Sequence, residues 1–140
     1  MDNIKDLFEK KLLEKIPKDS EKVQSSLKIA KAKLEEAKNL FNSDFLSNSL
    51  LSAYTSMFHC ARAVLYNEGV QEKSHYGVYA YLREKFSNKI PLELLNSFNS
   101  LRGDRHEVLY GFQEYVSKKK VERAILDCEE FLGIIEEMLI

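Results

Sequence analysis

The residues of this 140-residue chain that could do chemistry together lie in one short stretch, at Arg102, Arg105, His106 and Tyr110. At about 100° per residue, a helix places Arg102, His106 and Tyr110 in one row, with Arg105 about 60° to one side. Two guanidiniums can hold a phosphate, and an imidazole titrates near neutral pH. The set suits a phosphodiester, and cleavage of RNA by its own 2′-hydroxyl needs such groups and no metal.

The same stretch also has a purely structural interpretation. The arginines could pair with acidic neighbours, namely Asp104, Glu107 or Glu114, and Tyr110 could simply cover the core. Charged side chains on a helix surface are commonly only solvated or paired. Composition and spacing alone favour this structural interpretation over a catalytic one, and they leave both open.

Two further histidines and a lysine run complete the candidate binding residues. His59 lies in an apolar helical pattern, where a histidine is more often a satisfied core residue than a catalyst, and Arg62 nearby needs a partner. His75, at a helix start, is most often a capping or packing residue. Lys118 and Lys119 open a helix where cations oppose its dipole, which makes a phosphate contact the alternative to a solvated turn.

No cofactor is expected from the pattern of residues. The three histidines have no carboxylate at ligand spacing, so no metal site is predicted. Cys60 and Cys128 are widely separated and lie in apolar helical patterns, which favours two small buried hydrophobes. No phosphate-binding glycine loop and no nucleophile elbow is present.

Composition limits the remaining classes of function. The chain has 21 basic and 22 acidic residues, a net charge of −1, which argues against a surface given over entirely to nucleic acid or membrane. Residues 71–123 contain 10 basic and 7 acidic residues, so a modest positive region surrounds the arginine cluster. No apolar run is long enough to span a membrane and no signal peptide is visible, so a cytoplasmic protein is expected.

Helical periodicity and capping residues define the elements that must position these side chains. Apolar residues between Asn3 and Ile16 share one helical face, and Pro17 ends that helix. Asp19 or Ser20 caps the next helix, which breaks at 42–43. Asp44 is expected to cap a third helix, Phe45–Tyr66, which contains one charged residue and is therefore predicted to be the buried centre of the fold.

Three more helices follow this central one. Gly69 is expected in a left-handed conformation, and Ser74 caps a helix that reaches Phe86. Pro91 fits the first position of a helix whose apolar face continues to Phe112, with an interruption at 103–104. Ser117 caps the last helix.

The predicted fold is all-α: an antiparallel bundle of four to five helices with an extra N-terminal helix. Residues 1–18 form an N-terminal helical arm, and residues 19–140 form the bundle. The central helix should bury five residues between its neighbours, namely Leu51, Met57, Ala61, Val64 and Leu65.

Three blocks of sequence resemble the HEPN domain family, in particular its small stand-alone prokaryotic members. The blocks are LSAYTSMFHCARA at 51–63, KSHY at 73–76 and RHEVLYG at 105–111. The resemblance runs from about Ser20 to Leu139. It implies a helical bundle that usually forms a homodimer, binds RNA or a nucleotide, and often acts as the toxin half of a toxin–antitoxin pair. The antitoxin partner in such pairs is a minimal nucleotidyltransferase.

Active members of the family are metal-independent endoribonucleases whose motif is an arginine followed, after four to six residues, by a histidine. Here Arg105 is followed after four residues by Tyr110, and only three residues separate Arg102 from His106. The resemblance thus implies binding of RNA or a nucleotide, with Tyr110 as a candidate for modification with AMP by the partner. A metal-independent endoribonuclease and a non-catalytic structural or interaction bundle remain the alternatives.

Overall fold

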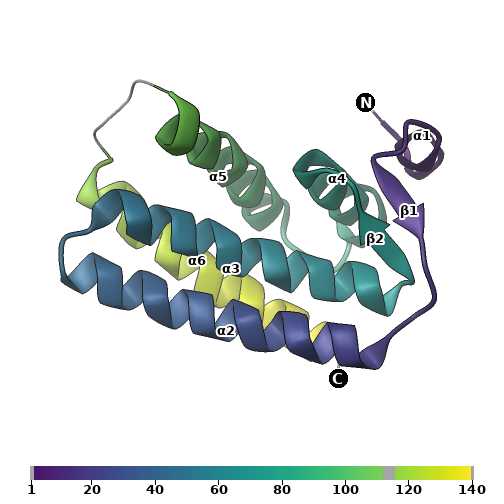
Figure 1. Ribbon diagram of the computed structural model, residues 1–140, viewed down its shortest axis with the longest axis horizontal. Coiled ribbons are helices and arrows are strands. Elements are labelled where there is room, and N and C mark those ends of the chain that lie inside the picture. The colour runs from purple at the N-terminus through teal and green to yellow at the C-terminus, as the bar shows by residue number, and fades with distance from the viewer. Residues whose placement is uncertain (1, 112–115, 140) are drawn as a thin grey trace.

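The computed structural model describes residues 2–111 and 116–139, and its helices form a bundle with a short two-stranded sheet at one end (Figure 1). This confirms the predicted all-α class. The elements in chain order are α1 (Ile4–Glu9), β1 (Leu13–Lys15), α2 (Ser20–Asn42), α3 (Leu46–Asn67), β2 (Val70–Glu72), α4 (His75–Phe86), α5 (Leu92–Tyr110) and α6 (Lys118–Met138).

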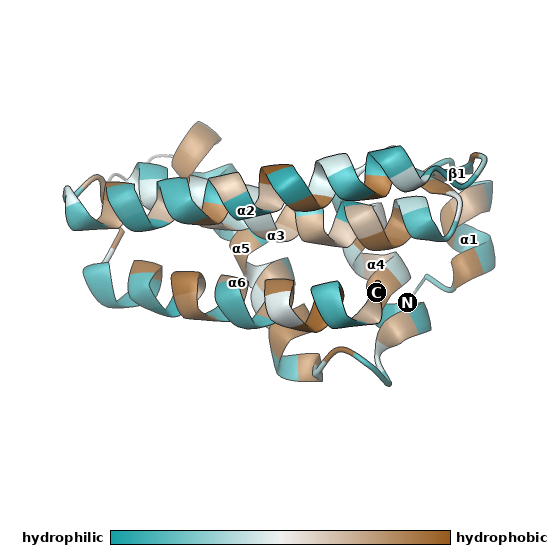
Figure 2. Ribbon diagram, turned by 90° about the horizontal axis from the view of Figure 1, so that it is seen from below, coloured by the Kyte–Doolittle hydropathy of each residue, from teal (hydrophilic) through white to brown (hydrophobic). Residues whose placement is uncertain are grey.

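The central helix α3 lies against α2 along its whole length and also contacts α4, α5 and α6 (Figure 1). It buries most of its circumference, as its single charged residue, Arg62, predicts. Met57, Ala61, Val64 and Leu65 are buried as predicted, whereas Leu51 is half-exposed. Both cysteines are buried and free. In Figure 2 the neighbouring helices carry hydrophilic residues on one side and hydrophobic residues on the other.

The capping residues fix where the helices begin. Asp19, Ser74 and Ser117 each accept a hydrogen bond from a backbone N–H in the first turn of the helix that follows, as predicted. The prediction for Asp44 is wrong. Asp44 has a φ of +63°, and Phe45 begins α3 without a side-chain cap. Asp44 is instead the residue that takes the left-handed conformation in the tight turn between α2 and α3, which aspartate tolerates better than most side chains.

The predicted N-terminal helix is too long. It ends at Glu9, because Lys11 has a φ of +59° and turns the chain into β1. β1 pairs antiparallel with β2, with Leu13 opposite Glu72. Leu13 and Val70 are both buried, so this long-range pairing places apolar residues of two distant segments in the core.

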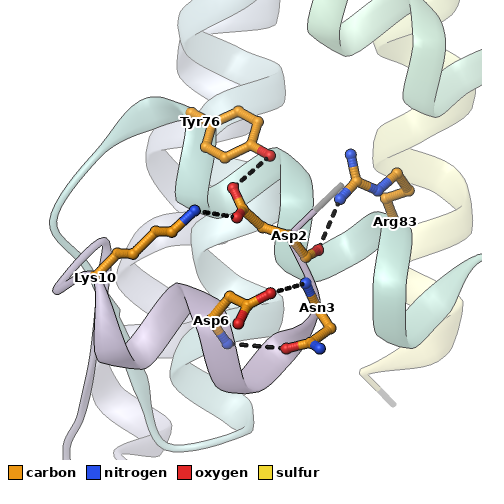
Figure 3. A network of polar contacts seen from close by, with 6 residues as sticks. All are labelled: Asp2, Asn3, Asp6, Lys10, Tyr76 and Arg83. Atoms are coloured by element: carbon orange, nitrogen blue, oxygen red, sulfur yellow. Dashed lines mark hydrogen bonds and ion pairs between the residues drawn. The ribbon is translucent and has the colours of Figure 1, made fainter.

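The arm is held against α4 by a polar network around Asp2 (Figure 3). The Tyr76 hydroxyl donates to the Asp2 carboxylate at 3.0 Å, and Lys10 binds the same carboxylate. Arg83 donates to the Asp2 backbone carbonyl at 3.1 Å. Leu7 of α1 is completely buried. The arm is therefore packed onto the bundle, and it contacts the helix that carries His75 and Tyr76.

Helix α5 carries the arginine cluster and is continuous through 103–104, where an interruption is predicted. Gly103 has open space around it, so neither a backbone turn nor a close approach requires a break there. Pro91 is the N-cap of α5 and not its first helical residue. The apolar face does not continue as predicted, since Leu109 is 44% exposed and Phe112 lies outside the described residues.

Candidate functional site

The two arginines of α5 both lie over aromatic rings. The guanidinium carbon of Arg102 is 5.7 Å from the centroid of the Tyr76 ring, and that of Arg105 is 5.9 Å from the centroid of the Tyr54 ring. Both side chains are half-buried. Arg102 donates from two nitrogens to the side-chain oxygen of Asn99, at 3.2 and 3.0 Å. Because that partner is a neutral amide, the contact orients the guanidinium without cancelling its charge.

Asp104 and Glu107, two of the acidic residues that could pair with these arginines, have other surroundings. Asp104 forms an ion pair with Lys120 at 3.0 Å, and Glu107 is exposed. Glu114 lies outside the described residues. Asp104 therefore ties α5 to the start of α6.

His75 lies in the same neighbourhood as the arginines, on the first turn of α4. Its Nδ1 is 2.8 Å from the hydroxyl oxygen of Tyr54, and its ring stacks on Phe58 with centroids 4.3 Å apart. The Tyr54 ring, which lies under Arg105, also stacks on the buried ring of Phe98. Helices α3, α4 and α5 thus meet at one cluster of aromatic rings, one imidazole and two guanidiniums, which we call the Arg–His cluster (Tyr54, Phe58, His75, Tyr76, Arg102, Arg105).

Burial and positive charge set the protonation states in the Arg–His cluster. Burial lowers the pKa of His75 below its ordinary value, and Arg105, Arg102 and Arg62 lower it further. His75 is therefore neutral at pH 7. Burial raises the pKa of Tyr54 far above its ordinary value, so its hydroxyl keeps its proton despite the two arginines of α5. The charges acting on both groups are cationic, which favours a negatively charged ligand.

His106 and Tyr110 lie on the solvent side of α5. Both are exposed, Tyr110 by 69%, and their rings lie 5.1 Å apart. The expected row from Arg102 through His106 to Tyr110 is therefore present on the helix, but it runs from the Arg–His cluster out to the surface. His106 and Tyr110 can be reached by a large partner or ligand.

His59 and Arg62 have structural surroundings on the half-exposed side of α3. Arg62 forms an ion pair with Glu72 at 2.8 Å and lies over the Phe58 and Tyr66 rings. This satisfies the need for a partner that its apolar helix implies. Burial lowers the pKa of His59, with further contributions from Arg62 and Lys33, and its buried Nδ1 has no partner among the described residues.

The lysines at the start of α6 are all exposed. Lys118 lies 3.8 Å from Asp44 and above the Phe41 ring, and Lys120 pairs with Asp104. The exposed Lys119 lies between them in sequence. These contacts connect the start of α6 to α5 and to the turn after α2.

Four residues of the site were not predicted to belong to it, namely Tyr54, Phe58, Tyr76 and Asn99, although the first three lie in the blocks 51–63 and 73–76. The signal for Asn99 is local, because a side chain three positions before Arg102 lies on the same helix face. Tyr76 follows His75 in one of the three blocks quoted above. Tyr54 meets His75 only through tertiary packing, and no local spacing indicates that pair.

The described residues (2–111 and 116–139) contain neither a cluster of metal-binding side chains nor a helix that could span a membrane. No set of three or more histidine, cysteine or acidic side chains is close enough there to hold a metal ion. None of the described helices combines the length and the apolar character needed to cross a membrane.

Comparison with known proteins gives a consistent result. The model of the HEPN domain family matches residues 23–138. A protein of Methanocaldococcus jannaschii named "Putative toxin" is 28% identical over 113 residues, which cover 79% of this chain and 77% of that protein. A "UPF0332 protein" of Pyrococcus horikoshii is 35% identical over 68 residues, 49% of this chain and 48% of the relative. A second M. jannaschii protein named "Putative toxin" is 32% identical over 69 residues, 49% of this chain and 52% of that protein.

Proposed function

Since the chain belongs to the HEPN domain family, we propose that it is a toxin-like protein that binds RNA through backbone phosphates, with Arg102 and Arg105 as the central contacts. The observation that carries this proposal is the pair of half-buried guanidiniums held over the Tyr76 and Tyr54 rings.

The geometry suits an oxyanion such as a phosphate. A guanidinium that lies over an aromatic ring can still donate from its in-plane N–H groups, so Arg105, and the N–H groups of Arg102 that do not bind Asn99, can meet phosphate oxygens. Asn99 and the two rings restrict the arginine rotamers before a ligand arrives, which reduces the entropy lost on binding. Half-burial weakens solvent screening and strengthens the attraction.

Exposed groups at the edge of the cluster extend this surface. His106 and Tyr110 continue the row along α5, and a base of single-stranded RNA can stack on such rings. Lys118 and Lys119 would add backbone contacts nearby. His59 and Arg62 flank the cluster on α3 and support it through Phe58.

We further propose that the chain functions as a homodimer. An isologous pairing with the 102–110 face near the two-fold axis would place two Arg–His clusters in one cleft and raise its positive potential. The exposed Leu109 on that face supplies apolar surface for the contact.

The toxin role draws on two relatives named as toxins, and it implies an antitoxin. The partner we propose is a minimal nucleotidyltransferase. Tyr110, 69% exposed, is accessible for modification by such an enzyme. Expression of the chain alone should slow growth of a bacterial host, and Arg105→Ala should relieve that effect.

A metal-independent endoribonuclease is the second candidate function. The observation that favours it is His106, which is exposed one turn beyond Arg102 on α5, because a phosphodiester-cleaving site needs a proton acceptor as well as cations. If the chain neither binds nor cuts RNA, the remaining hypothesis is a structural or interaction bundle.

Binding of a mixed-sequence single-stranded RNA, followed by fluorescence anisotropy, tests the proposal. Arg102→Ala and Arg105→Ala should each weaken binding by about 10-fold or more, since hydrogen bonds between charged groups contribute about 1.5–3 kcal/mol. Lys28→Ala removes an exposed cation on α2 and is the matched control. Equal affinities for all four proteins would contradict the proposed site.

A further inference from the structure

We propose that His75 is a third phosphate contact of the Arg–His cluster: it is held as the neutral tautomer with its proton on Nε2, and this Nε2–H donates to a phosphate oxygen of the bound RNA strand. The assignment rests on the proposed RNA binding and adds to it a donor that carries no charge. It places this donor on α4, away from the row of α5 residues that the sequence indicates.

The buried hydroxyl of Tyr54 fixes the tautomer of His75. Tyr54 is 1% exposed, and burial raises the pKa of its hydroxyl far above the ordinary value, so the hydroxyl keeps its proton. Among the described residues, its one hydrogen-bond partner is Nδ1 of His75, at 2.8 Å. Because a buried hydroxyl proton without an acceptor costs free energy, Tyr54 donates and Nδ1 accepts. A neutral imidazole carries a single N–H group, so its proton lies on Nε2.

The surroundings of His75 keep the imidazole neutral. Burial lowers its pKa, and Arg105 and Arg102 of α5 and Arg62 of α3 lower it further. The acidic Glu72 of β2 is paired with Arg62 at 2.8 Å. The hydroxyl bonded to Nδ1 acts in the same direction as the cations, because it binds a lone pair that the protonated imidazole does not have. The Arg–His cluster therefore offers two charged donors and one neutral donor at pH 7.

The packing around His75 orients Nε2 and leaves it open to a ligand. The imidazole stacks on Phe58 with centroids 4.3 Å apart, and it is nearly parallel to the Tyr54 ring, with an angle of 22° between the planes. Nε2 has no hydrogen bond in the described part of the chain, and it is not one of the buried side-chain atoms there that lack a partner. Nε2 is therefore in contact with solvent and can meet an incoming acceptor.

A phosphate oxygen is the acceptor that suits this N–H group. Arg105 lies over the ring of Tyr54, the residue bonded to His75, so a strand held by Arg105 lies close to the imidazole. The phosphate oxygens carry the negative charge of RNA, and cationic surroundings favour them over the neutral acceptors of the bases. A donor whose orientation and protonation are already fixed loses little entropy when the strand binds.

The tautomer can be tested on the full chain without RNA, by ¹⁵N NMR of the imidazole nitrogens near neutral pH. In the wild type, Nε2 of His75 should carry the proton. Tyr54→Phe keeps the ring and removes the hydroxyl, so the proton should redistribute between the two nitrogens and the pKa of His75 should rise. Tyr81→Phe removes a hydroxyl that contacts Glu68 and Lys85, and it should leave the His75 signals unchanged. A proton on Nδ1 in the wild type would overturn the assignment.

The phosphate contact can be tested by fluorescence anisotropy with single-stranded RNA. His75→Phe keeps an aromatic ring against Phe58 and removes the donor. It should weaken binding about 10-fold, because a hydrogen bond to a charged phosphate is lost. The double variant Tyr54→Phe and His75→Phe leaves no buried hydroxyl without a partner, and it should bind as weakly as the single variant. Circular dichroism melts of both variants establish that the loss does not come from unfolding.

The salt dependence of this loss separates a neutral contact from a charged one. A cation that binds a phosphate releases counterions, so its removal makes binding less dependent on salt. His75→Phe should instead lower the affinity and keep the wild-type salt dependence near neutral pH. The loss should be equal for oligo(A) and oligo(U), because a phosphate contact weakens binding uniformly across sequences.

Three results would overturn the assignment and leave the proposed function intact. His75→Phe could bind RNA as tightly as the wild type, which would exclude a contact. It could reduce the salt dependence by one phosphate contact, which would mean that the imidazole is charged. Its loss could be confined to one of the two RNAs, which would indicate a base contact. Failure of the wild type to bind either RNA is a separate result, and it would overturn the proposed function together with this assignment.

Discussion

The hydroxyl of Tyr54 and Nδ1 of His75 lie 2.8 Å apart although 21 positions separate the two residues in the chain. This contact joins the central helix α3 to the first turn of α4. Arg105 of α5 lies over the other partner, the Tyr54 ring, so three helices meet at one pair of side chains. The chemistry proposed for the site depends on this meeting point more than on any spacing within α5.

The packing of α3 predicts that Ala61→Glu prevents folding. Ala61 is completely buried, and an unpaired buried carboxylate is among the costliest single changes. Circular dichroism should show no cooperative melt for this variant. Asn48→Glu adds the same side chain at an exposed position of α3 and should melt like the wild type. A near-wild-type melt of Ala61→Glu would contradict the assignment of α3 as the core helix.

The N-terminal arm should contribute measurably to stability. Leu7→Ala removes a completely buried side chain and should lower the free energy of unfolding by about 2–5 kcal/mol. Leu92→Ala, at a position 58% exposed, makes the same chemical change and should cost at most about 0.5 kcal/mol. Urea denaturation of both variants measures the difference. Equal losses would mean that the arm does not pack on the bundle as described.

How much of this arrangement the sequence can predict depends on whether the signal is local. Ser74 and Ser117 are recognisable because an N-cap bonds within its own first turn. The central position of α3 is recognisable because this long segment contains only one charged residue, Arg62. β1 is not, because Leu13 becomes a strand residue only by pairing with the chain around Glu72. The helical periodicity between Asn3 and Ile16 therefore gives the right structure as far as Glu9 and the wrong one at Leu13–Lys15.

The same difference between local and long-range signals applies to the candidate site. Arg102 and Arg105 can be selected from their spacing on α5, and Asn99 lies within one turn of them. His75 can be listed as a candidate, but its bond to Tyr54 depends on how α4 packs against α3. Gly103 suggests an interruption that the helix does not have, since a lone glycine is tolerated where nothing requires a turn.

Stability should fall as the pH is lowered from about 7 to about 5. Burial and nearby cations lower the pKa values of His59 and His75, so the unfolded chain binds protons more readily than the folded chain. The stabilisation is fully present above about pH 6.5, the ordinary histidine pKa, and is lost as the pH falls through the lowered values. Thermal melts across this range should show the decrease. In a double variant with His59→Gln and His75→Gln, the melting temperature should decrease less steeply with falling pH. A decrease as steep as in the wild type would contradict the burial of these imidazoles.

The proposed homodimer predicts a mass of twice the 16.3 kDa chain by light scattering at micromolar concentration. Leu109→Glu places a charge on the proposed contact face and should shift the mass toward the monomer. Leu126→Glu changes an equally exposed leucine on α6 and should leave the dimer intact. A single monomer mass for the wild type would exclude the proposed arrangement.

The salt dependence of RNA binding tests the central claim most directly. If Arg102 and Arg105 bind backbone phosphates, the logarithm of the association constant falls linearly with the logarithm of salt concentration. Each of Arg102→Ala and Arg105→Ala should reduce the steepness of that line by about one phosphate contact, and Lys28→Ala should not change it. The proposed binding of RNA by the Arg–His cluster is contradicted if the wild-type line is flat, or if both arginine variants keep the wild-type slope.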